Sequence, residues 1–481
     1  MSRLKFSIRG KGLALAAGCA AMVASCGGGG SAPPAGGGGG AVTPAPTPPP
    51  VAACALRARQ DWVLAQLQEW YLFPTLLDAS VNPAAHATVD SYLDALVAPA
   101  RAQNRDRYFT YVTSIAEENA YYEQGETAGF GIRLAYDTPN GRVFVVEAFE
   151  GGPALANAID RGTEILQIGG SNVSILMATG GPFAVIEALG PDTAGLSRAL
   201  VVRDLSGVQR TVTLTKTVFA LDPVSDRYGA KILTDGARRI GYLNMRTFID
   251  TSEPNLRAAF ADFKAQGVTE LIVDLRYNGG GLLSIAALMI DLMGLGRDGQ
   301  VNTYVTFRDS KASENETVLF DPQPESIAPT KIAFIGTGST ASASEMVING
   351  MVPYLAGNMA LVGSNTYGKP VGQIALDRPE CDDRLRSISF KLENANHQGE
   401  YFNGLAGTVG TTCRANDDIA HQLGDPNEAM VRAALDYLAG RSCTAIATAA
   451  APFGAPAIPA RGVLADYGAQ STVRRELPGA F

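Results

Sequence analysis

The chain has 481 residues, with 39 Lys and Arg against 47 Asp and Glu, which gives a formal net charge of −8. Proteins that bind DNA or RNA need an excess of basic side chains to neutralise phosphate, so the acidic balance argues against nucleic acid as a partner. The length favours two or three domains rather than one.

The first residues have the layout of a secretory signal. Arg3, Lys5, Arg9 and Lys11 come without any acidic residue and precede an apolar stretch over residues 13–24, which is too short to span a membrane. Its removal takes the net charge from −8 to −12.

The end of this stretch, VASC at residues 23–26, resembles a bacterial lipobox. Cleavage before Cys26 and lipidation of its sulfur would tether the mature protein. We therefore expect a lipoprotein signal at 1–25, with a plain secretory signal as the alternative. The earlier AAGC, which ends at Cys19, leaves too short an apolar core.

Both ends of the remaining chain are poor in residues that can form a core. Residues 26–51 are almost entirely Gly, Pro, Ala and Thr, and residues 446–481 begin as an Ala/Pro-rich tail. Such compositions cannot bury enough apolar surface and are typical of linkers. The folded part is predicted at about residues 52–445.

Four further cysteines, an even number in an exported chain, predict two disulfides; they are Cys54, Cys381, Cys413 and Cys443. Three pairings are possible. The favoured one joins Cys54 to Cys443, at the two ends of the folded part, and Cys381 to Cys413 in a local loop. Four free, buried thiols are the alternative.

The apolar pattern divides the folded part into three. Over 52–125 apolar residues recur at helical spacing, as in DWVLAQLQEWYLF and VDSYLDALV, which predicts a small helical region with an aromatic core. Over 126–220 the period becomes that of strands, expected at 129–136, 142–149, 197–204 and 208–218.

Over 221–445 strands and helices alternate. Strands are expected at 240–245, 270–275, 331–336 and 359–363, and helices at 253–267, at 282–294 and after Ser342. Apolar strands joined by helices indicate a largely parallel sheet with crossover connections. The predicted fold class is therefore α/β, as a multidomain α+β chain with a helical region, a β domain and a parallel-sheet core.

Active groups in such sheets gather at the carboxyl ends of strands. DLRYNGGG follows one predicted strand and TGSTASASE follows another, so both should open at the same rim. The glycine run could offer backbone amides to an anion, or it could be only a tight turn. It has the spacing of neither a dinucleotide fingerprint nor a P-loop.

Ser342 has two possible roles. Ser342 to Glu345 spell a capping box, in which the serine serves only the helix start. Alternatively, a serine at a helix start lies where free amides and the macrodipole stabilise a developing oxyanion, with Ser339 or Thr340 taking over the cap.

A nucleophilic serine needs a base. His86, His397 and His421 lie in no recognisable motif, and no Gly-x-Ser-x-Gly elbow is present. Neither His-Glu-x-x-His nor paired Cys-x-x-Cys occurs, so no metal or cofactor is expected. The other candidate base is Lys369, in NTYGKPVGQ, if burial keeps it neutral; in a loop it would ordinarily be a solvated charge.

Two resemblances sharpen these alternatives. GFGI and RGTEILQIGG resemble the peptide-binding loop and a following strand of PDZ domains, with Glu164 where Asp is usual. This resemblance implies that the backbone of Gly129, Phe130, Gly131 and Ile132 holds the end of a peptide that adds to the sheet as a strand. A plain small β domain is the alternative.

DLRYNGGG, GSTASASE and TYGK, in this order, resemble the motifs of C-terminal-processing (tail-specific) serine peptidases, which usually carry a PDZ domain; the lipobox suggests a bacterial lipoprotein-like member. The resemblance implies Ser342 as nucleophile, Lys369 as general base and Gln373 as the residue that orients the lysine. It also implies oxyanion donors in the Ala343 amide and in that of Gly279 or Gly280.

Two departures concern the lysine loop. Pro370 stands where the family has Gly, and the interval from the serine to the lysine is a couple of residues longer than in the best-known members. Neither departure removes a catalytic residue type.

The function implied is a serine endopeptidase with a Ser/Lys dyad that cleaves exported proteins near their C-terminal ends. Its partners would be substrates with free C-termini and, through the lipid anchor, a membrane of the bacterial cell envelope, facing the periplasm or the exterior. Alternatives are an inactive PDZ-bearing lipoprotein adaptor and a Ser-His ester hydrolase that uses His397 or His421.

The chain's own end, RRELPGAF, is of the apolar kind that a PDZ groove accepts, and is a candidate self-substrate or autoinhibitory tail.

Overall fold

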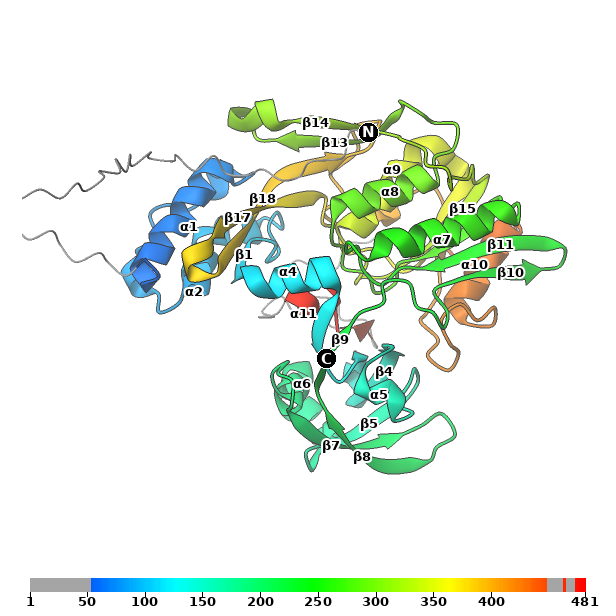
Figure 1. The fold of residues 1–481 in the computed structure, drawn as a ribbon, viewed down its shortest axis with the longest axis horizontal. Helices are drawn as coiled ribbons and strands as arrows, with labels where there is room; N and C mark the ends of the chain where they lie inside the picture. Colours follow the sequence, from blue (N-terminus) through cyan, green and yellow to red (C-terminus); the bar gives the residue numbers. More distant parts are fainter. Residues whose placement is uncertain (1–52, 448–461, 464–471) are drawn as a thin grey trace, which may run out of the picture.

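The computed structural model describes residues 53–447, 462–463 and 472–481 (Figure 1). The predicted signal peptide, the lipidation site Cys26 and the linker lie outside these residues. Within the described residues, no helix combines the length and the apolar character needed to cross a membrane.

The core contains a six-stranded sheet in the order β10-β11-β12-β15-β16-β19. All neighbours from β11 onwards pair in parallel, and β10 is an antiparallel edge. The predicted parallel sheet with crossover helices is thus confirmed. Its elements are β10 (Ala230–Asp235), β11 (Arg238–Asn244), α7 (Ser252–Ala265), β12 (Glu270–Asp274), α8 (Leu283–Leu292), β15 (Lys331–Gly336), α9 (Ala343–Leu355), β16 (Met359–Gly363), β19 (Thr412–Arg414) and α10 (Ala429–Leu438).

Side chains of the central strands alternate between the two faces of this sheet, as period-2 geometry requires. On β15, Ile332 and Phe334 pack with α7, α8 and α9, whereas Ala333 and Ile335 pack with α10. Burial on both faces explains the continuous apolar runs of these strands.

A second, antiparallel sheet of five strands does not follow from the sequence pattern. Its elements are β1 (Tyr111–Ser114), β13 (Val301–Phe307), β14 (Glu316–Leu319), β17 (Val371–Arg378) and β18 (Asp383–Glu393). Strand β1 belongs to the N-terminal region and pairs with β18, so that region is joined to the core by a shared sheet. The N-terminal helices are α1 (Leu56–Trp70), α2 (Val89–Leu96), α3 (Ala98–Ala102) and α4 (Ile115–Gln124).

The strand-rich middle of the chain forms a separate β domain below the core (Figure 1). Its elements are β3 (Ile132–Asp137), β4 (Arg142–Ala148), α5 (Pro153–Ala156), β5 (Glu164–Ile168), β6 (Ser171–Asn172), α6 (Val173–Leu189), β7 (Ser197–Arg203) and β8 (Gln209–Thr215). Two strands that pair with each other, β2 (Glu126–Gly129) and β9 (Thr217–Ala220), lead into and out of it. Helix α6 does not follow from the sequence, because Gly180, Gly181 and Pro182 interrupt its pattern; Gly181 has φ +63°.

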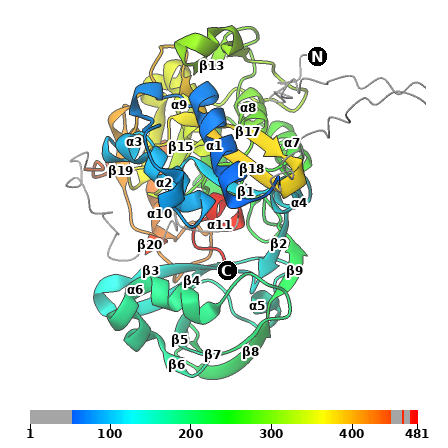
Figure 2. The ribbon, with the colours of Figure 1, turned by 90° about the vertical axis from the view of Figure 1, so that its left-hand side faces the viewer.

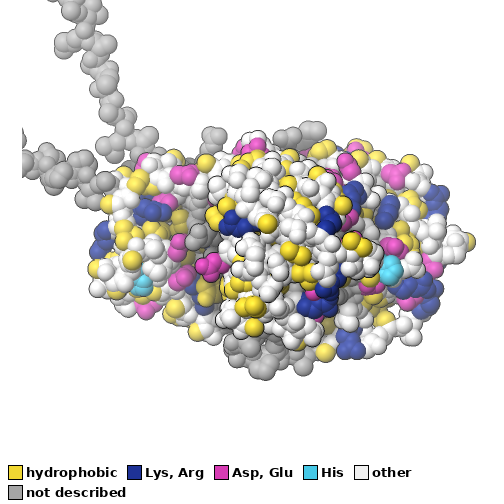
Figure 3. Space-filling view, turned by 90° about the horizontal axis from the view of Figure 1, so that it is seen from below, with side chains coloured by type: hydrophobic (Ala, Val, Ile, Leu, Met, Phe, Trp, Pro, Cys, Tyr) yellow, Lys and Arg dark blue, Asp and Glu magenta, His cyan; other side chains and the backbone are white. Residues whose placement is uncertain are grey.

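Seen from the side of the β domain, acidic and basic side chains are intermixed with apolar ones (Figure 3). This face therefore lacks the one-sided positive charge that would steer a polyanion.

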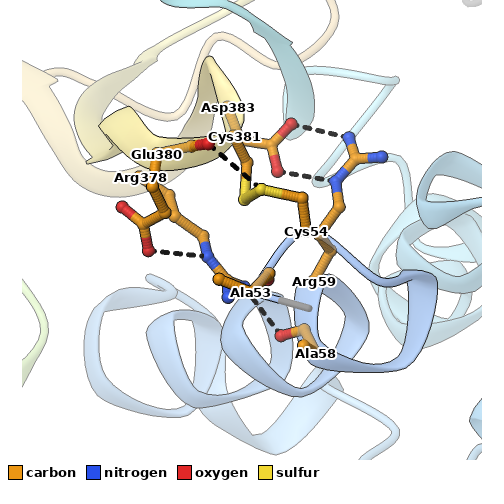
Figure 4. Close-up of a disulfide and its surroundings, with 8 residues drawn as sticks. All are labelled: Ala53, Cys54, Ala58, Arg59, Arg378, Glu380, Cys381 and Asp383. Carbon is orange, nitrogen blue, oxygen red and sulfur yellow. Dashed lines mark hydrogen bonds and ion pairs between the residues drawn. A yellow bond between two sulfur atoms is a disulfide. The ribbon is translucent and has the colours of Figure 1, made fainter. Parts of the chain in front are cut away.

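The two disulfides predicted from the cysteine count are present, but the favoured pairing is wrong. Cys54 is bonded to Cys381, and Cys413 to Cys443. Cys54 meets Cys381 because the start of α1 lies against the turn between β17 and β18, where Arg59 also pairs with Asp383 (Figure 4). A choice based on sequence ends could not anticipate this packing.

The tail contributes ordered structure at two places. Strand β20 (Gly462–Val463) pairs with β3, and helix α11 (Thr472–Glu476) lies between the core and the β domain (Figure 2). The residues after α11 continue along β3, where Arg133 and Ala480 form an antiparallel bridge.

Candidate active site

The two motif-bearing loops meet at one rim of the parallel sheet. Strands β12 and β15 are parallel neighbours, so the loops that follow them leave from the same edge. They are hydrogen bonded to each other, because the Asn278 carbonyl accepts from the Ala341 amide at 3.1 Å and from the Ser344 hydroxyl at 3.0 Å. The structure therefore brings together the glycine run and the serine turn.

Ser342 is the residue immediately before α9, and its backbone is strained. It has φ +55° and ψ −116°, an arrangement that L-residues other than glycine seldom adopt. Such conformations cost about 1–3 kcal/mol and persist where the surroundings impose them, often at functional sites. The residue is 7% exposed.

The predicted oxyanion donors differ in what their amides do. Gly279 donates its N–H to the carbonyl of Glu476 at 3.2 Å. Gly280 instead donates to the side chain of Asn278 at 2.9 Å, so its amide is already engaged. Ala343 is the first helical residue, where an amide has no intrahelical acceptor. The Gly280 amide is thus engaged within its own loop, whereas the Gly279 amide is engaged by a residue of the tail.

Gly280 still matters for close packing against the serine. A Cβ on this residue would lie 2.8 Å from the Cβ of Ser342 and 3.3 Å from the Ala343 nitrogen. Its φ of +127° also favours glycine. Only glycine at this position lets the loop approach the turn so closely.

Lys369 is buried, with 9% of its surface exposed. Burial lowers the pKa of its ammonium group, because desolvation disfavours the charged form. The Nζ atom donates to Oε1 of Gln373 at 2.9 Å and lies 5.1 Å from the centre of the Phe109 ring. Gln373 is fixed in turn, since its amide donates to the Phe109 carbonyl. Among the described residues, no hydrogen bond joins Lys369 Nζ directly to the Ser342 hydroxyl.

Glu345 ties the serine turn to the lysine loop, a role that the capping-box pattern alone does not reveal. Its Oε2 accepts from the Ser342 amide at 3.2 Å and from the Lys369 amide at 2.7 Å. Its Oε1 accepts from the Gly368 amide at 2.7 Å and from the Thr366 hydroxyl at 2.6 Å. Burial raises the pKa of this carboxyl, while these donors oppose the rise.

The N-terminal region supplies a further support that no motif signals. Arg107 donates to the carbonyls of Tyr367, Gly368 and Phe402, and its guanidinium lies over the ring of Tyr367 at 4.0 Å. Arg107 therefore contacts the lysine loop directly, and Phe109 contacts it through Gln373. Sequence reasoning missed both residues because they are distant in the chain from every motif.

A pocket opens beside these groups and is shared by five parts of the chain. It is lined by Tyr108, Phe109, Tyr111, Gly279, Gly338, Ser339, Ala341, Tyr367, Lys369, Arg474, Arg475, Glu476 and Pro478. The tail residues belong to α11 and the turn after it, so part of the pocket wall comes from the end of the chain.

The proposed peptide-binding residues run from the end of β2 to the start of β3, beside the same tail. Ile132 exchanges two backbone hydrogen bonds with Phe481, at 3.2 and 2.8 Å. A Cβ on Gly129 would lie 2.6 Å from the Phe481 carbonyl carbon, and one on Gly131 would collide with Gly152. Phe130 is fully buried in the core of the β domain. The glycines thus permit close backbone approach at this edge.

The histidines lie elsewhere. His397 stacks on Tyr304, with ring centres 4.3 Å apart, and His421 pairs with Asp418 at 2.7 Å. Neither lines the pocket beside Ser342. Within the described residues there is no cluster of three or more His, Cys, Asp or Glu side chains that could hold a metal ion.

Comparison with known proteins agrees with this arrangement. Residues 239–396 match the model of "Peptidase family S41". The "C-terminal processing peptidase, chloroplastic" of Tetradesmus obliquus is 27% identical over 268 residues, covering 53% of this chain and 53% of that protein. The "Carboxy-terminal processing protease CtpA" of Bacillus subtilis is 24% identical, covering 58% of this chain and 54% of that protein. The chain thus matches about half the length of these curated relatives.

The fold is also found in a solved structure. The crystal structure of a candidate S41 protease from Bacteroides fragilis superposes with a TM-score of 0.61 at 22% identity, covering 79% of this chain and 97% of that one. This likeness confirms the mixed α/β fold class. Residues 239–396, which contain the serine turn and the lysine loop, are thus similar to peptidase family S41.

Proposed function

We propose that the chain is an exported serine endopeptidase in which Ser342 is the nucleophile and Lys369 the general base. Gln373 orients the lysine, and the Gly279 and Ala343 amides stabilise the oxyanion. The observation that carries the proposal is the single carboxylate of Glu345, which fixes the turn of Ser342 relative to the loop of Lys369, a buried lysine whose pKa is lowered by desolvation.

The reaction would be acyl transfer. Ser342 Oγ bonds to the substrate carbonyl carbon and its proton passes to neutral Lys369 Nζ. The C–N bond then breaks, and the lysine returns the proton to the leaving amine. Water attacks the resulting ester, again with the lysine as base, and releases the new carboxyl end. The lack of a direct hydrogen bond between Ser342 and Lys369 is compatible with this role, because catalytic contacts often tighten only when substrate binds.

The β domain at 126–220 would be a PDZ-like docking module. Its β3 edge accepts residues 479–481 in antiparallel pairing, and the Leu134 amide donates to the Gly479 carbonyl at 2.8 Å. A substrate's C-terminal segment would add in the same way, with main-chain bonds for affinity and a side-chain pocket for selection. The two disulfides support an oxidising compartment outside the cytoplasm.

The proposal is tested by cleavage of proteins with varied C-terminal residues. Ser342→Ala and Lys369→Ala should each reduce kcat by at least about a thousandfold with unchanged circular dichroism. Ser313→Ala and Lys264→Ala, at exposed sites of the same residue types, are the matched controls. Cleavage at the wild-type rate by Ser342→Ala would disprove the nucleophile.

The adaptor alternative is separated by a fluorophosphonate probe. The endopeptidase should become labelled, and Ser342→Ala should not. A native protein that binds peptides but neither cleaves them nor reacts with the probe would be the inactive adaptor.

A further inference from the structure

The end of the described chain follows a continuous path from the β domain to the candidate active site. At one end, Phe481 pairs with Ile132 and is 6% exposed within the apolar core of the β domain. Leu477 is fully buried among Tyr121, Tyr122 and neighbouring apolar side chains. At the other end, Arg474 pairs with Asp192 at 2.7 Å.

Between these anchors the segment covers the catalytic groups. The Glu476 carbonyl accepts a hydrogen bond from the Gly279 amide. The two backbones are close, since a Cβ on Gly279 would lie 3.1 Å from the Glu476 carbonyl carbon. Glu476 and Pro478 line the pocket together with Lys369. A donor that should serve the oxyanion of a substrate is therefore already occupied.

We propose that residues 473–481 act as a tethered inhibitor that occupies both the peptide-docking edge of β3 and the active-site pocket. This inference rests on the proposed peptidase function. A substrate segment must displace residues 479–481 from β3 before its own carbonyl can reach the Gly279 amide.

The geometry fits an inhibitor better than a self-substrate. The Leu477 amide, which would be the leaving nitrogen of a cut after Glu476, donates to the Val473 carbonyl at 2.7 Å. The Ala480 amide donates back to the Leu477 carbonyl at 3.1 Å. The segment thus crosses the pocket as a helical turn rather than as the extended strand that peptide docking by strand addition uses.

The negative charge of Glu476, like the occupation of the pocket by the segment, would lower the activity of the site. The Glu476 carboxyl is 6% exposed and lies close enough to Lys369 to favour the charged form of the lysine. Arg386, Asp106 and Glu345 also act on this amine, Arg386 against its charge and the two carboxyls in favour of it. A general base must be neutral to take a proton, so an ionised Glu476 opposes the neutral form of the lysine that burial favours. Burial raises the pKa of Glu476 itself, and the charges of Lys369 and Arg386 oppose that rise.

The experiment weakens both apolar anchors in the full chain. Leu477→Ser with Phe481→Ser should raise kcat/KM for a dilute peptide substrate about tenfold or more, because a tethered segment competes at an effective concentration of the order of mM. Leu319→Ser with Leu295→Ser, at exposed leucines, is the matched control and should leave kcat/KM unchanged. A synthetic peptide of residues 473–481 should inhibit the released variant.

A second readout does not need catalysis. In a Ser342→Ala background, fluorescence anisotropy should show tighter binding of the labelled 473–481 peptide to the double serine variant than to the chain with its native segment. Tighter binding without hydrolysis by any variant would support the inhibitor and overturn the peptidase. Equal hydrolysis together with equal binding would overturn the inhibitor and leave the peptidase standing. Loss of residues 477–481 from the purified wild-type chain, detected by mass spectrometry, would also overturn the inhibitor, since the segment would then be a substrate.

Discussion

At Lys369, burial and hydrogen bonding act on one amine with different consequences. Burial lowers the pKa and so supplies the neutral form, whereas the bond to Gln373 Oε1 fixes the direction of the amine. The sequence motif predicted which residues form this pair, because Gly368-Lys369 and Gln373, four positions after the lysine, are visible in the sequence. It could not predict that Lys369 is buried, or that its amine lies beside Phe109, a residue far away in the chain.

A negative charge at position 373 should raise the pKa of Lys369. In Gln373→Glu an anion would lie within hydrogen-bond distance of Lys369 Nζ and would favour the ammonium form, so the lysine pKa should rise. The rising limb of the kcat/KM–pH profile should move to higher pH, with lower activity near neutrality and recovery in alkaline buffer.

Gln373→Met, which removes the acceptor without adding charge, is the control. It should lower kcat without moving the limb towards alkaline pH. An identical limb in wild type and Gln373→Glu would show that the observed ionisation belongs to a group other than Lys369.

At the scale of elements, the start of α9 combines the features of a helix cap with those of the candidate active site. Glu345 does reach back to the Ser342 amide, as a capping box predicts, and it also accepts from the Lys369 loop. One carboxylate therefore serves both the start of the helix and the loop of Lys369. Sequence spacing shows the first contact, since it is local, but not the second, which spans 24 residues.

Glu345→Gln should separate activity from folding. Both carboxylate oxygens accept from backbone amides, and a glutamine must turn one NH₂ group towards those donors. Leaving buried donors without an acceptor costs about 1–3 kcal/mol, and we expect a loss of about 10- to 100-fold in kcat as the serine turn and the lysine loop lose their common support.

The check combines steady-state kinetics with urea unfolding, and Glu314→Gln at an exposed site is the control. KM should change little, because Glu345 does not line the pocket. A variant with lower stability but wild-type kcat would assign the carboxylate to the helix alone.

The disulfide between Cys54 and Cys381 fixes another pair of elements, α1 and the β17–β18 turn. It joins residues 327 apart, whereas Cys413 and Cys443 are 30 apart. The cysteine count predicted the number of bonds, but the partners depend on a contact between α1 and β18 that no local pattern encodes.

Removing each disulfide in turn should lower the stability by an amount that increases with the length of the loop it closes. The chain-entropy model gives about 6 kcal/mol for a loop of several hundred residues and between about 3 and 4 kcal/mol for one near 30. Cys54→Ala with Cys381→Ala should thus lower Tm more than Cys413→Ala with Cys443→Ala, measured by calorimetry without reductant. The reverse order would show that local packing, rather than loop closure, dominates.

At the scale of the whole molecule, buried ion pairs join the β domain to the core. Glu147 on β4 pairs with Arg133 on β3 at 2.9 Å and with Arg246 of the core at 2.7 Å. A second group joins Arg161 of the β domain to Asp417 of the core. The sequence predicts both bodies from their hydrophobic periods, but not this contact, because isolated charges in a sequence do not indicate which of them become buried together.

Arg133 also extends the network to the tail. Its Nη1 donates to the carbonyl of Tyr277, beside the glycine run, at 2.6 Å, and to that of Pro478 at 3.2 Å. The position of the β domain, the glycine run and the proposed inhibitory segment are therefore linked through one buried side chain.

The pH dependence of stability should report this interface. Burial alone would raise the pKa of Glu147, but Arg246 and Arg133 outweigh it and lower the pKa from 4.5 to about 2. The unfolded chain therefore takes up the proton first as the pH falls. The stabilisation, about 3 kcal/mol for a shift of this size, is complete above pH 4.5 and disappears as the pH falls towards 2.

Glu147→Gln should remove that dependence and expose its cause. Two buried guanidinium groups lose their shared anion, so the free energy of unfolding near neutral pH should fall by about 3–5 kcal/mol. Urea unfolding at several pH values between 3 and 7 should show a shallower acid slope than in wild type, while Glu316→Gln, at an exposed site, should keep the wild-type slope. If Glu147→Gln and wild type lost stability in parallel over that range, the carboxylates responsible for acid sensitivity would lie outside the interface, and the β domain would be held against the core by its apolar contacts.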